Sequence, residues 1–397
     1  MNRKNILVGV SGSIAAYKAA TLVSILVKTG ADVRVVMTKN ATNIINPITF
    51  ETLTGHKCMV DTFDRNFEFK ANHVSIAQQA DLFILAPATA NIIAKVANGL
   101  ADDMVSTTFL AAKCPKIICP AMNTAMYENP VTQDNIEKCR HYGYKVVKPA
   151  SGYLACGDTG KGKMPEPETI AEFALQEIEC EKDLAGKKIL VTAGPTRESL
   201  DPVRFITNHS SGKMGYAIAK AAARRGADVT LVSGPVNLEE PLFVNTVKVS
   251  SAKEMFEAVK DASSSMDIII KAAAVADYRP KTVSQNKIKK HDDELSLELE
   301  RTDDILAWLG RNKRSGQVLC GFSMETENLI QNSRAKLEKK NLDMVCANSL
   351  TTKGAGFGTD TNAITIITKD GNRELELMSK TDAANSILDF IKENFGD

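Results

Sequence analysis

The sequence predicts an α/β protein made of two three-layer domains with mainly parallel sheets. Two segments support this prediction, because each contains a β-branched run, a Gly/Ser turn, an Ala-rich helical stretch and a second strand. The first is Asn5–Thr38, and the second begins at Lys187 and continues over Ser210–Gly234. Strands and helices that alternate in this way form βαβ units. A chain of 397 residues that opens such a unit twice is expected to hold two domains, here 1–182 and 186–397.

The other strands of both sheets are expected from short apolar runs between turn signals. These runs are Leu82–Ala86, Lys116–Cys119 and Lys145–Val147 in the first half, and Thr246–Val249, Asp267–Lys271, Gln317–Gly321 and Met344–Ala347 in the second. Gly30 and Gly226 each precede a second strand and fit helix C-caps. The charged stretch Glu177–Lys188 is the expected domain boundary.

Two stretches of the second half depart from the alternation of strand and helix. An additional loop, Pro195–His209, separates the opening strand from its helix, and loops of this length are usually functional or disordered. Near the carboxyl end, the pattern around Asp370 and Gly371 predicts a β-hairpin. An amphipathic helix is expected over Thr381–Glu393.

The composition excludes several classes of protein. The formal net charge is +1, which gives no reason to expect nucleic acid as a partner. No stretch approaches the roughly 20 apolar residues that span a bilayer, and the amino terminus lacks a cleavable signal pattern. The eight cysteines show no CxxC pair and no zinc-type spacing. We therefore expect a cytoplasmic protein with free thiols and no membrane partner.

One stretch, CGDTGKGKM, nearly matches a phosphate-binding P-loop. Gly157, four residues, Gly162 and Lys163 have the required spacing, but Met164 stands where a P-loop has Ser or Thr. The residues before it are not expected to form a strand, and prolines follow it at once. The glycines therefore favour a lid that folds over a site.

Polar turns at expected strand ends indicate a ligand site in the first half. Ser11 and Ser13 lie between a buried strand and a helix start, where free N–H groups suit a phosphate; a tight turn with an N-cap is the alternative. Pro87–Thr89 and the turn containing Asn123 follow other strands, and open α/β sheets bind ligands at this edge. His73 stands alone, and a lone histidine is more often structural than catalytic.

Several unlike motifs occur in a characteristic order. SGSIAAYK, NHVS, APATANIIAK, GLADDMVSTT and PAMNTAMYENP resemble motifs of flavin-mononucleotide cysteine decarboxylases, and GYLACGDTGKGKMPEP resembles their substrate flap. The second half resembles phosphopantothenoylcysteine synthetases. Nearly the whole chain thus resembles the bifunctional enzymes of coenzyme A biosynthesis. The resemblance implies a Rossmann-like flavoprotein domain followed by a Rossmann/ribokinase-like ligase domain.

The resemblance also implies two reactions. CTP-dependent coupling of 4′-phosphopantothenate to cysteine passes through an acyl-cytidylate, and FMN-dependent decarboxylation of the product then yields 4′-phosphopantetheine and CO₂. For the second reaction it implies catalytic roles for His73, Asn123 and Cys156, with Cys156 returning a proton. An ordinary cysteine pKa of about 8.5 keeps such a thiol protonated at neutral pH. The implied FMN contacts are Gly12, Ser13, Thr38, Pro87, Thr89, Asn91 and Ser106.

In the second half, the residues themselves indicate an anion site. Lys336 and Lys340 lie four residues apart on one helix face, where they repel each other unless an anion lies between them or Glu338 and solvent screen them. The resemblance implies Mg²⁺ at Asp277, and Asn208 in the acyl-cytidylate step. It places phosphopantothenate at Arg204, Ser210, Ser211 and Gly212. It places CTP at Lys271, Ala272, Ala273, Asp277, Lys287, Thr302, Asp303, Asp304, Ile305, Phe322, Lys336 and Lys340.

One motif departs from the family pattern. Many relatives read Asn-Pro-Asp-Ile where this chain reads Thr302-Asp303-Asp304-Ile305. Backbone contacts to CTP can persist there, whereas a side-chain contact from the missing Asn is in doubt. The resemblance further implies a homo-oligomer, a dodecamer built from decarboxylase trimers and ligase dimers.

Two rival functions are weighed against this one. A flavin-binding regulatory subunit needs neither a complete flap nor a ligase half, and both are present here. An NAD-dependent oxidoreductase needs the dinucleotide fingerprint, which neither glycine turn matches.

Overall fold

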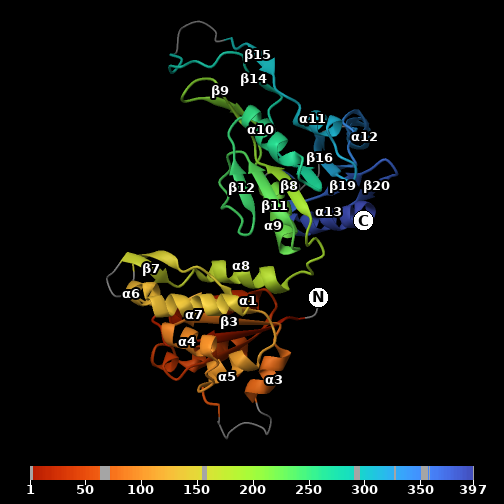
Figure 1. Ribbon diagram of the computed structural model, residues 1–397. Helices are drawn as coiled ribbons and strands as arrows, with labels where there is room; N and C mark the ends of the chain where they lie inside the picture. Colours follow the sequence, from red (N-terminus) through yellow and green to blue (C-terminus); the bar gives the residue numbers. More distant parts are fainter. Residues whose placement is uncertain are drawn as a thin grey trace. The chain divides into compact units, whose positions relative to one another are not determined.

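The computed structural model describes residues 3–62, 72–153, 159–289, 296–325, 328–349, 356 and 358–396, with 72, 73, 325 and 349 described by their backbone alone. The chain separates into two compact units, Met1–Cys180 and Glu181–Asp397 (Figure 1). The sequence placed the two domains at 1–182 and 186–397. Each unit is a three-layer α/β structure with a mainly parallel sheet, which confirms the predicted fold class.

The first unit is built on a five-stranded parallel sheet. Its order is β2-β1-β3-β4-β5, and all four pairings are parallel. The strands are β1 (Asn5–Val10), β2 (Asp32–Met37), β3 (Leu82–Ala88), β4 (Lys116–Pro120) and β5 (Lys145–Val146). The predicted apolar runs fall on these strands, because strands buried on both faces must be apolar along their whole length.

Helices cover both faces of this sheet. One face packs α1 (Ala16–Lys28), α2 (Pro47–Thr54) and α8 (Pro167–Ile178) against Ile6 and Val8. The opposite face packs α3 (Asn72–Gln79), α4 (Ala90–Asn98), α5 (Met104–Ala111) and α7 (Pro130–His141) against Leu7. Successive side chains of a strand point to opposite faces, which accounts for this division of the core. Two short helices, η1 (Ala41–Asn43) and α6 (Thr124–Glu128), complete the unit.

A small hairpin corrects one expectation in this unit. The segment before the near-P-loop was expected not to be a strand, yet β6 (Ala150–Tyr153) pairs antiparallel with β7 (Thr159–Lys163). Gly160 and Gly162 therefore lie in an extended strand, whereas a P-loop places its glycines in a turn that leads into a helix. The conclusion that this stretch is no P-loop remains, now for a structural reason.

The second unit contains an eight-stranded sheet of order β12-β11-β8-β13-β16-β17-β19-β20. Six strands run parallel: β8 (Lys188–Ala193), β11 (Asp228–Ser233), β12 (Asn245–Lys248), β13 (Ile268–Lys271), β16 (Val318–Glu325) and β17 (Met344–Ser349). The last two, β19 (Ile364–Ile367) and β20 (Asn372–Glu374), form the predicted antiparallel hairpin. Its turn is closed by Thr368 N–H, which donates to the carbonyl oxygen of Gly371 at 2.9 Å.

Helices cover both faces of the second sheet as well. The core on one face includes residues of α9 (Lys213–Arg224) and α13 (Lys380–Phe395), which contains the predicted final helix. The core on the other face includes residues of α10 (Ala252–Ser263), α11 (Ile305–Arg311) and α12 (Leu329–Lys339). This arrangement again gives three layers with the sheet in the middle.

Three two-stranded pairs lie outside the main sheet. They are β9 (Arg197–Ser199) with β10 (Phe205–Thr207), β14 (Tyr278–Pro280) with β15 (Leu299–Arg301), and β18 (Thr361–Asn362) with β21 (Met378–Ser379). The predicted loop Pro195–His209 is thus a folded hairpin for part of its length. Figure 1 shows β9, β14 and β15 beyond the end of the main sheet.

Candidate functional sites

In the first unit, Ser11 joins the turns that follow β1 and β3. Its buried hydroxyl donates to the carbonyl oxygen of Pro87 at 2.8 Å and accepts from Thr89 N–H at 3.0 Å. Thr89 also caps α4 by accepting from Ile92 N–H, and Asn91 lies exposed in the first turn of that helix. The turns bearing the predicted FMN contacts are therefore held together at the carboxyl edge of the sheet.

The turn after β2 reaches the same edge. Thr38 N–H donates to the carbonyl oxygen of Val10 at 3.0 Å. A Cβ atom on Gly12 would lie 2.7 Å from Asn40 Cβ, so these two turns are in close contact. Helix α1 starts beside them without a side-chain cap, whereas Thr89 and Asp103 cap α4 and α5. Uncapped N–H groups at a helix start suit a phosphate group.

Asn123 lies in the turn after β4, against the β6–β7 hairpin. Ala121 N–H donates to the carbonyl oxygen of Ala88, and Met122 N–H donates to that of Gly162 at 3.0 Å. A Cβ on Gly162, whose φ is +129°, would lie 2.3 Å from the Met122 oxygen. The Asn123 side chain accepts from Ala125 N–H and caps α6. The hairpin thus touches the turn that carries a predicted catalytic residue.

Three predicted residues of this unit are not placed at that edge by their described contacts. Ser106 is fully buried, and its hydroxyl donates to Asp103 at 3.0 Å in the capping box that begins α5. The side chain of His73, in α3, and the whole of Cys156, between β6 and β7 in the chain, lie outside the described residues.

In the second unit, the turn that leads into α9 is anchored by Asn208. Its amide donates to the carbonyl oxygens of Ala274 at 3.1 Å and Val275 at 3.2 Å, which follow β13. Gly212, with φ at +76°, begins α9 without a side-chain cap. The predicted phosphopantothenate and CTP segments are therefore neighbours across the end of β8 and β13.

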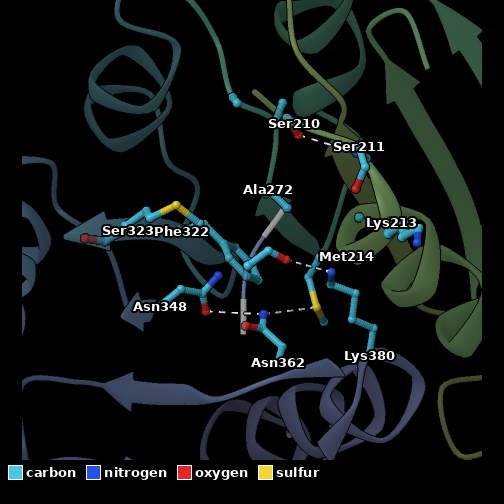
Figure 2. Close-up of a pocket in the computed structure, with 16 residues that line it drawn as sticks. Ser210, Ser211, Lys213, Met214, Ala272, Phe322, Ser323, Asn348, Asn362 and Lys380 are labelled. Carbon is cyan, nitrogen blue, oxygen red and sulfur yellow. Dashed lines mark hydrogen bonds between the residues drawn. The ribbon is translucent and has the colours of Figure 1, made fainter. Parts of the chain in front are cut away.

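A cavity of about 180 Å³ opens between these segments. It is lined by the predicted residues Ser210, Ser211, Gly212, Ala272, Ala273 and Phe322, as Figure 2 shows for most of them. Ser210 and Ser211 lie at one end of the view, and the side chains of Asn348 and Asn362 approach each other at the other. Their amide groups are 3.4 Å apart, from nitrogen to oxygen.

Lys213, Asn348, Asn362 and Lys380 are among the lining residues that the sequence analysis did not predict. Lys213 follows the glycine turn directly, so the SSGK stretch offered a signal for it. Asn362 and Lys380 come from the far end of the chain, where no local pattern marks them. Lys380 is buried and donates to the carbonyl oxygen of Gly356 at 3.0 Å. Burial, together with nearby Lys213, lowers the pKa of Lys380.

Three predicted lysines gather beside this cavity. Lys336 donates to the carbonyl oxygen of Phe322 at 2.7 Å, and Lys340 pairs with Asp304 at 2.9 Å. Lys271 ends β13, and burial with the charges of Lys336 and Lys340 lowers its pKa to about 8. Positive charge that is partly buried and only partly compensated favours an anionic ligand.

The divergent motif packs against the same region. Thr302 donates its hydroxyl to the carbonyl oxygen of Ala276 at 2.6 Å, and its N–H donates to that of Asp277 at 3.0 Å. Asp304 caps α11 by accepting from Ala307 N–H. These two hydrogen bonds of Thr302 hold the motif next to Asp277, so the position of the motif does not depend on the Asn that many relatives have there.

Arg204 and Lys287 are not among the residues that line the 180 Å³ cavity. Arg204 pairs with the buried Asp201 at 2.6 Å and donates to the carbonyl oxygen of Ile288. The Arg204 guanidinium holds the pKa of Asp201 well below its ordinary value. Ile288 N–H also donates to Asp201, at 3.1 Å, so this carboxylate joins the turn before β10 to the segment with exposed Lys287.

The described residues limit other kinds of site. They contain no group of three or more His, Cys, Asp or Glu side chains able to hold a metal, and Asp277 is exposed. Seven cysteines are described, and none of them forms a disulfide. None of the helices in the described part of the chain is long and apolar enough to cross a membrane.

Comparison with known proteins identifies both halves of the chain. Residues 1–179 match the family described as Flavoprotein, and residues 184–395 match the DNA/pantothenate metabolism flavoprotein C-terminal domain. The crystal structure of the C-terminal domain of Coenzyme A biosynthesis bifunctional protein CoaBC is 48% identical, covers 54% of this chain and 97% of its own, and has a TM-score of 0.46.

Two curated relatives match over almost their whole length. Coenzyme A biosynthesis bifunctional protein CoaBC of Bacillus subtilis is 49% identical over 395 residues, which cover 98% of this chain and 97% of the relative. The protein of the same name from Vibrio cholerae is 46% identical over 392 residues, which cover 98% of each chain. The chain therefore belongs to the family of bifunctional coenzyme A biosynthesis proteins.

Proposed function

We propose that this chain catalyses two consecutive steps of coenzyme A biosynthesis. Its second unit couples 4′-phosphopantothenate to cysteine with CTP, and its first unit decarboxylates 4′-phosphopantothenoylcysteine to 4′-phosphopantetheine and CO₂. The observation that carries this proposal is the combination, in one chain, of a flavoprotein-type sheet edge with a lysine cluster beside a cavity of about 180 Å³. The full-length relatives support the same assignment.

The first unit fits FMN at the carboxyl edge of its sheet. The turns containing Gly12, Ser13, Thr38 and Pro87–Thr89 converge there, and the uncapped start of α1 offers N–H groups to the phosphate. Bound flavin would supply an acceptor for the hydride on the carbon that bears the substrate thiol. Asn123 would hold the substrate carboxylate, His73 would orient or deprotonate the substrate, and Cys156 would return a proton to the decarboxylated product.

The second unit fits a nucleoside triphosphate. Lys271, Lys336 and Lys340 would neutralise phosphate charge as the carboxylate of phosphopantothenate attacks the α-phosphate and releases pyrophosphate. Magnesium usually keeps several waters and binds through one or two carboxylates plus substrate phosphates. The exposed carboxylate of Asp277 is consistent with that mode, which needs no cluster of three or more protein ligands, and the described residues contain no such cluster. Asn208 would serve the acyl-cytidylate at the end of β13.

Phosphopantothenate would lie along Ser210, Ser211 and Gly212, with its phosphate toward Arg204. Arg204 already pairs with Asp201, so it would offer the phosphate only its remaining N–H groups. The exposed Lys287, on the segment tied to Asp201, would approach CTP from the same side.

Exposed apolar side chains support assembly into homo-oligomers. In the second unit they occur on or near the strand pairs β9–β10 and β14–β15, where Val203 is 60%, Val283 53%, Tyr278 49% and Phe205 44% exposed. Patches of this kind usually mark an interaction surface. We assign this surface to ligase dimers, and the exposed Ile14 and Tyr17 of the first unit to decarboxylase trimers, within a dodecamer. The seven described cysteines, none of which forms a disulfide, support a reducing compartment, the cytoplasm.

The experiment that tests both halves is mass spectrometry of the products formed from phosphopantothenate, cysteine and CTP with magnesium. We expect phosphopantetheine, CMP, pyrophosphate and CO₂. Phosphopantothenoylcysteine without CO₂ would refute the decarboxylase half, whereas unreacted phosphopantothenate would refute the ligase half.

A second experiment isolates the proton donor. Cys156→Ser is expected to retain flavin, release CO₂ and stall before phosphopantetheine forms. A matched control is Cys114→Ser, which changes a half-buried thiol of the same unit. Normal turnover by Cys156→Ser would remove Cys156 from the mechanism.

A further inference from the structure

A second, larger cavity lies on the other side of the turn that leads into α9. Its volume is about 440 Å³. Ser210, Ser211 and Lys213 line both this cavity and the 180 Å³ cavity, whereas Asn208, Arg197, His209 and the segment 235–238 line only the larger one. The two cavities therefore share this turn, where the proposed function places the activation of the acyl group of phosphopantothenate.

The lining of the larger cavity is basic. Arg197, His209 and Lys213 contribute to it, and none of the described residues that line it is acidic. Lys213 is already paired with Asp360 at 2.7 Å. Arg197 forms no ion pair within the described part of the chain, and its guanidinium lies over the ring of Phe205, 4.6 Å from the ring centre. Among the Lys and Arg residues of this lining, Arg197 is thus the one without a described ion pair, and its guanidinium can bind an anionic ligand.

The fold places Arg197 next to the residues of the acyl step. Arg197 in β9 pairs in register with Thr207 in β10, and Asn208 follows Thr207 directly. The Arg197 N–H donates to the carbonyl oxygen of Ser250 at 2.8 Å, which holds its backbone to the end of β12. Another part of the lining is apolar and includes Pro235, Val236 and Leu238. A ligand with a carboxylate at one end and a small apolar group at the other matches these walls.

We propose that this cavity binds the amino acid that attacks the acyl-cytidylate, with its carboxylate on Arg197 and its thiol side on the Val236 wall. The inference rests on the proposed ligase function. An arginine fork matches a carboxylate in a bidentate manner. Positive charge around the site also lowers the pKa of the bound amine, which favours the neutral form required for attack.

The chemical step balances without a further reactant. The amine, after losing one proton to solvent, attacks the acyl carbon and forms the C–N bond. The bond between that carbon and the phosphate oxygen breaks, and CMP leaves with the electron pair. The nitrogen releases a second proton as the amide forms. Approach from the Arg197 side leaves the nucleotide side free for the departing CMP.

The test compares cysteine with cysteamine, which lacks only the carboxylate. In the parent enzyme we expect kcat/KM for cysteine to exceed that for cysteamine. Arg197→Met should lower kcat/KM for cysteine about 10- to 100-fold, the usual range for a lost charged hydrogen bond, while the value for cysteamine stays within about twofold. Arg197→Lys should recover part of the preference. Arg373→Met, which removes an exposed arginine of β20, is the matched control.

Other outcomes overturn the proposal in distinguishable ways. An equal loss with both amines would mean that Arg197 only maintains the fold. A higher KM for phosphopantothenate with an unchanged KM for cysteine would place the substrate phosphate in this cavity. An unchanged preference for cysteine would leave Arg197 without a role in binding. If the parent releases no pyrophosphate from phosphopantothenate and CTP, the ligase function fails first, and the cavity proposal fails with it.

Discussion

The two units open with the same βαβ pattern, yet they hold the turns of their sites by different means. In the first unit, the hydroxyl of Ser11 and backbone N–H groups join the turns. In the second, Lys271, Lys336 and Lys340 lie close together at the corresponding edge, and burial together with the charges of Lys336 and Lys340 lowers the pKa of Lys271. Both opening helices, α1 and α9, start without a side-chain cap.

This contrast follows from what each edge must bind. A monophosphate with a large apolar ring is held by neutral donors and a helix start, because little charge has to be offset. A triphosphate that develops further charge during nucleotidyl transfer requires cations. The backbone frame provides a place for a phosphate in both units, and side chains outside the opening motif decide how much negative charge it can hold.

The largest effect is expected from removing the central cation. Lys271→Met should lower pyrophosphate release from phosphopantothenate and CTP about 100-fold, since hydrogen bonds to charged groups contribute about 1.5–3 kcal/mol. Decarboxylation of supplied phosphopantothenoylcysteine should be unchanged. Lys260→Met, an exposed lysine of α10, is the control. Equal loss in both reactions would mean that the two units are not independent sites.

The titration of Lys271 provides a second measure of the same charge. Its pKa lies at about 8, below the ordinary 10.5, so the folded protein loses this proton before the unfolded chain does. The charge on Lys271 therefore lowers the free energy of unfolding by its full amount below about pH 8, and this effect disappears as the pH rises to 10.5. Bound triphosphate raises this pKa again.

CTP should consequently bind with proton uptake near pH 8–9, and its affinity should fall as the pH rises through this range. Calorimetry in two buffers of different ionisation enthalpy measures the uptake. Binding without proton uptake at pH 8.5 would contradict a depressed pKa for Lys271.

Asn208→Asp should separate the two halves of the ligase reaction. The new carboxylate would face the carbonyl oxygens of Ala274 and Val275, where the amide now donates. We expect acyl-cytidylate to accumulate and its conversion to amide to fall about 100-fold, which rapid-quench analysis can follow. Asn312→Asp changes an equivalent amide bond to Trp308 outside the site. Normal amide formation by Asn208→Asp would exclude the proposed role.

Gly162→Ala should affect the first unit alone. The added Cβ would lie 2.3 Å from the Met122 oxygen, at a φ of +129° that suits glycine. The hairpin must then move off the Asn123 turn, and we expect decarboxylation to fall at least about tenfold with ligation unchanged. Gly152→Ala, in the same hairpin and also at a positive φ of +156° but with only Lys163 Cδ at 4.0 Å, is the control for the contact itself. Equal decarboxylase activity of the two variants would show that the close contact between Gly162 and Met122 is not needed for the reaction.

The smallest effect is expected from Ser11→Ala. Without the hydroxyl, Thr89 N–H loses its acceptor, which should cost about 1–3 kcal/mol of stability and weaken flavin retention. Thermal unfolding and flavin content after gel filtration measure both. Ser24→Ala on α1 is the control. Unchanged flavin retention by Ser11→Ala would show that the joined turns are not needed for binding.

The elements were predictable where one local pattern determines them. The apolar runs of β3, β4, β13 and β17 were placed within two residues of their observed bounds, because a strand buried on both faces must be apolar throughout. The β6–β7 hairpin was missed because Gly160 and Gly162 read as a flexible turn. They are glycines for another reason, since the turn at Met122–Thr124 leaves no room for a Cβ.

The partners of charged residues were the least predictable part of the site. The sequence suggested an anion between Lys336 and Lys340, or screening by Glu338 and solvent, but it did not suggest the partners that these lysines have within the protein, the Phe322 carbonyl oxygen and Asp304. The role of Arg204 at a substrate phosphate stays a prediction, but its partner within the protein, the buried Asp201, was not foreseen. Which charged groups pair depends on their distances in the folded structure, and these distances cannot be read from the spacing of residues along the chain.

The sequence by itself determined the two α/β units, the strands of each sheet and the turns at their carboxyl edges. It could do so because a buried strand or helix requires apolar residues in a regular pattern along a short stretch of the chain. Only the tertiary structure decided which charges meet, which glycines lack room for a side chain, and that Lys380 and Asn362 reach a cavity opened by the turn before Lys213. Those contacts join separate parts of the chain, 36 positions apart for Asp304 and Lys340 and 147 positions apart for Lys213 and Asp360, and the fold alone brings them together.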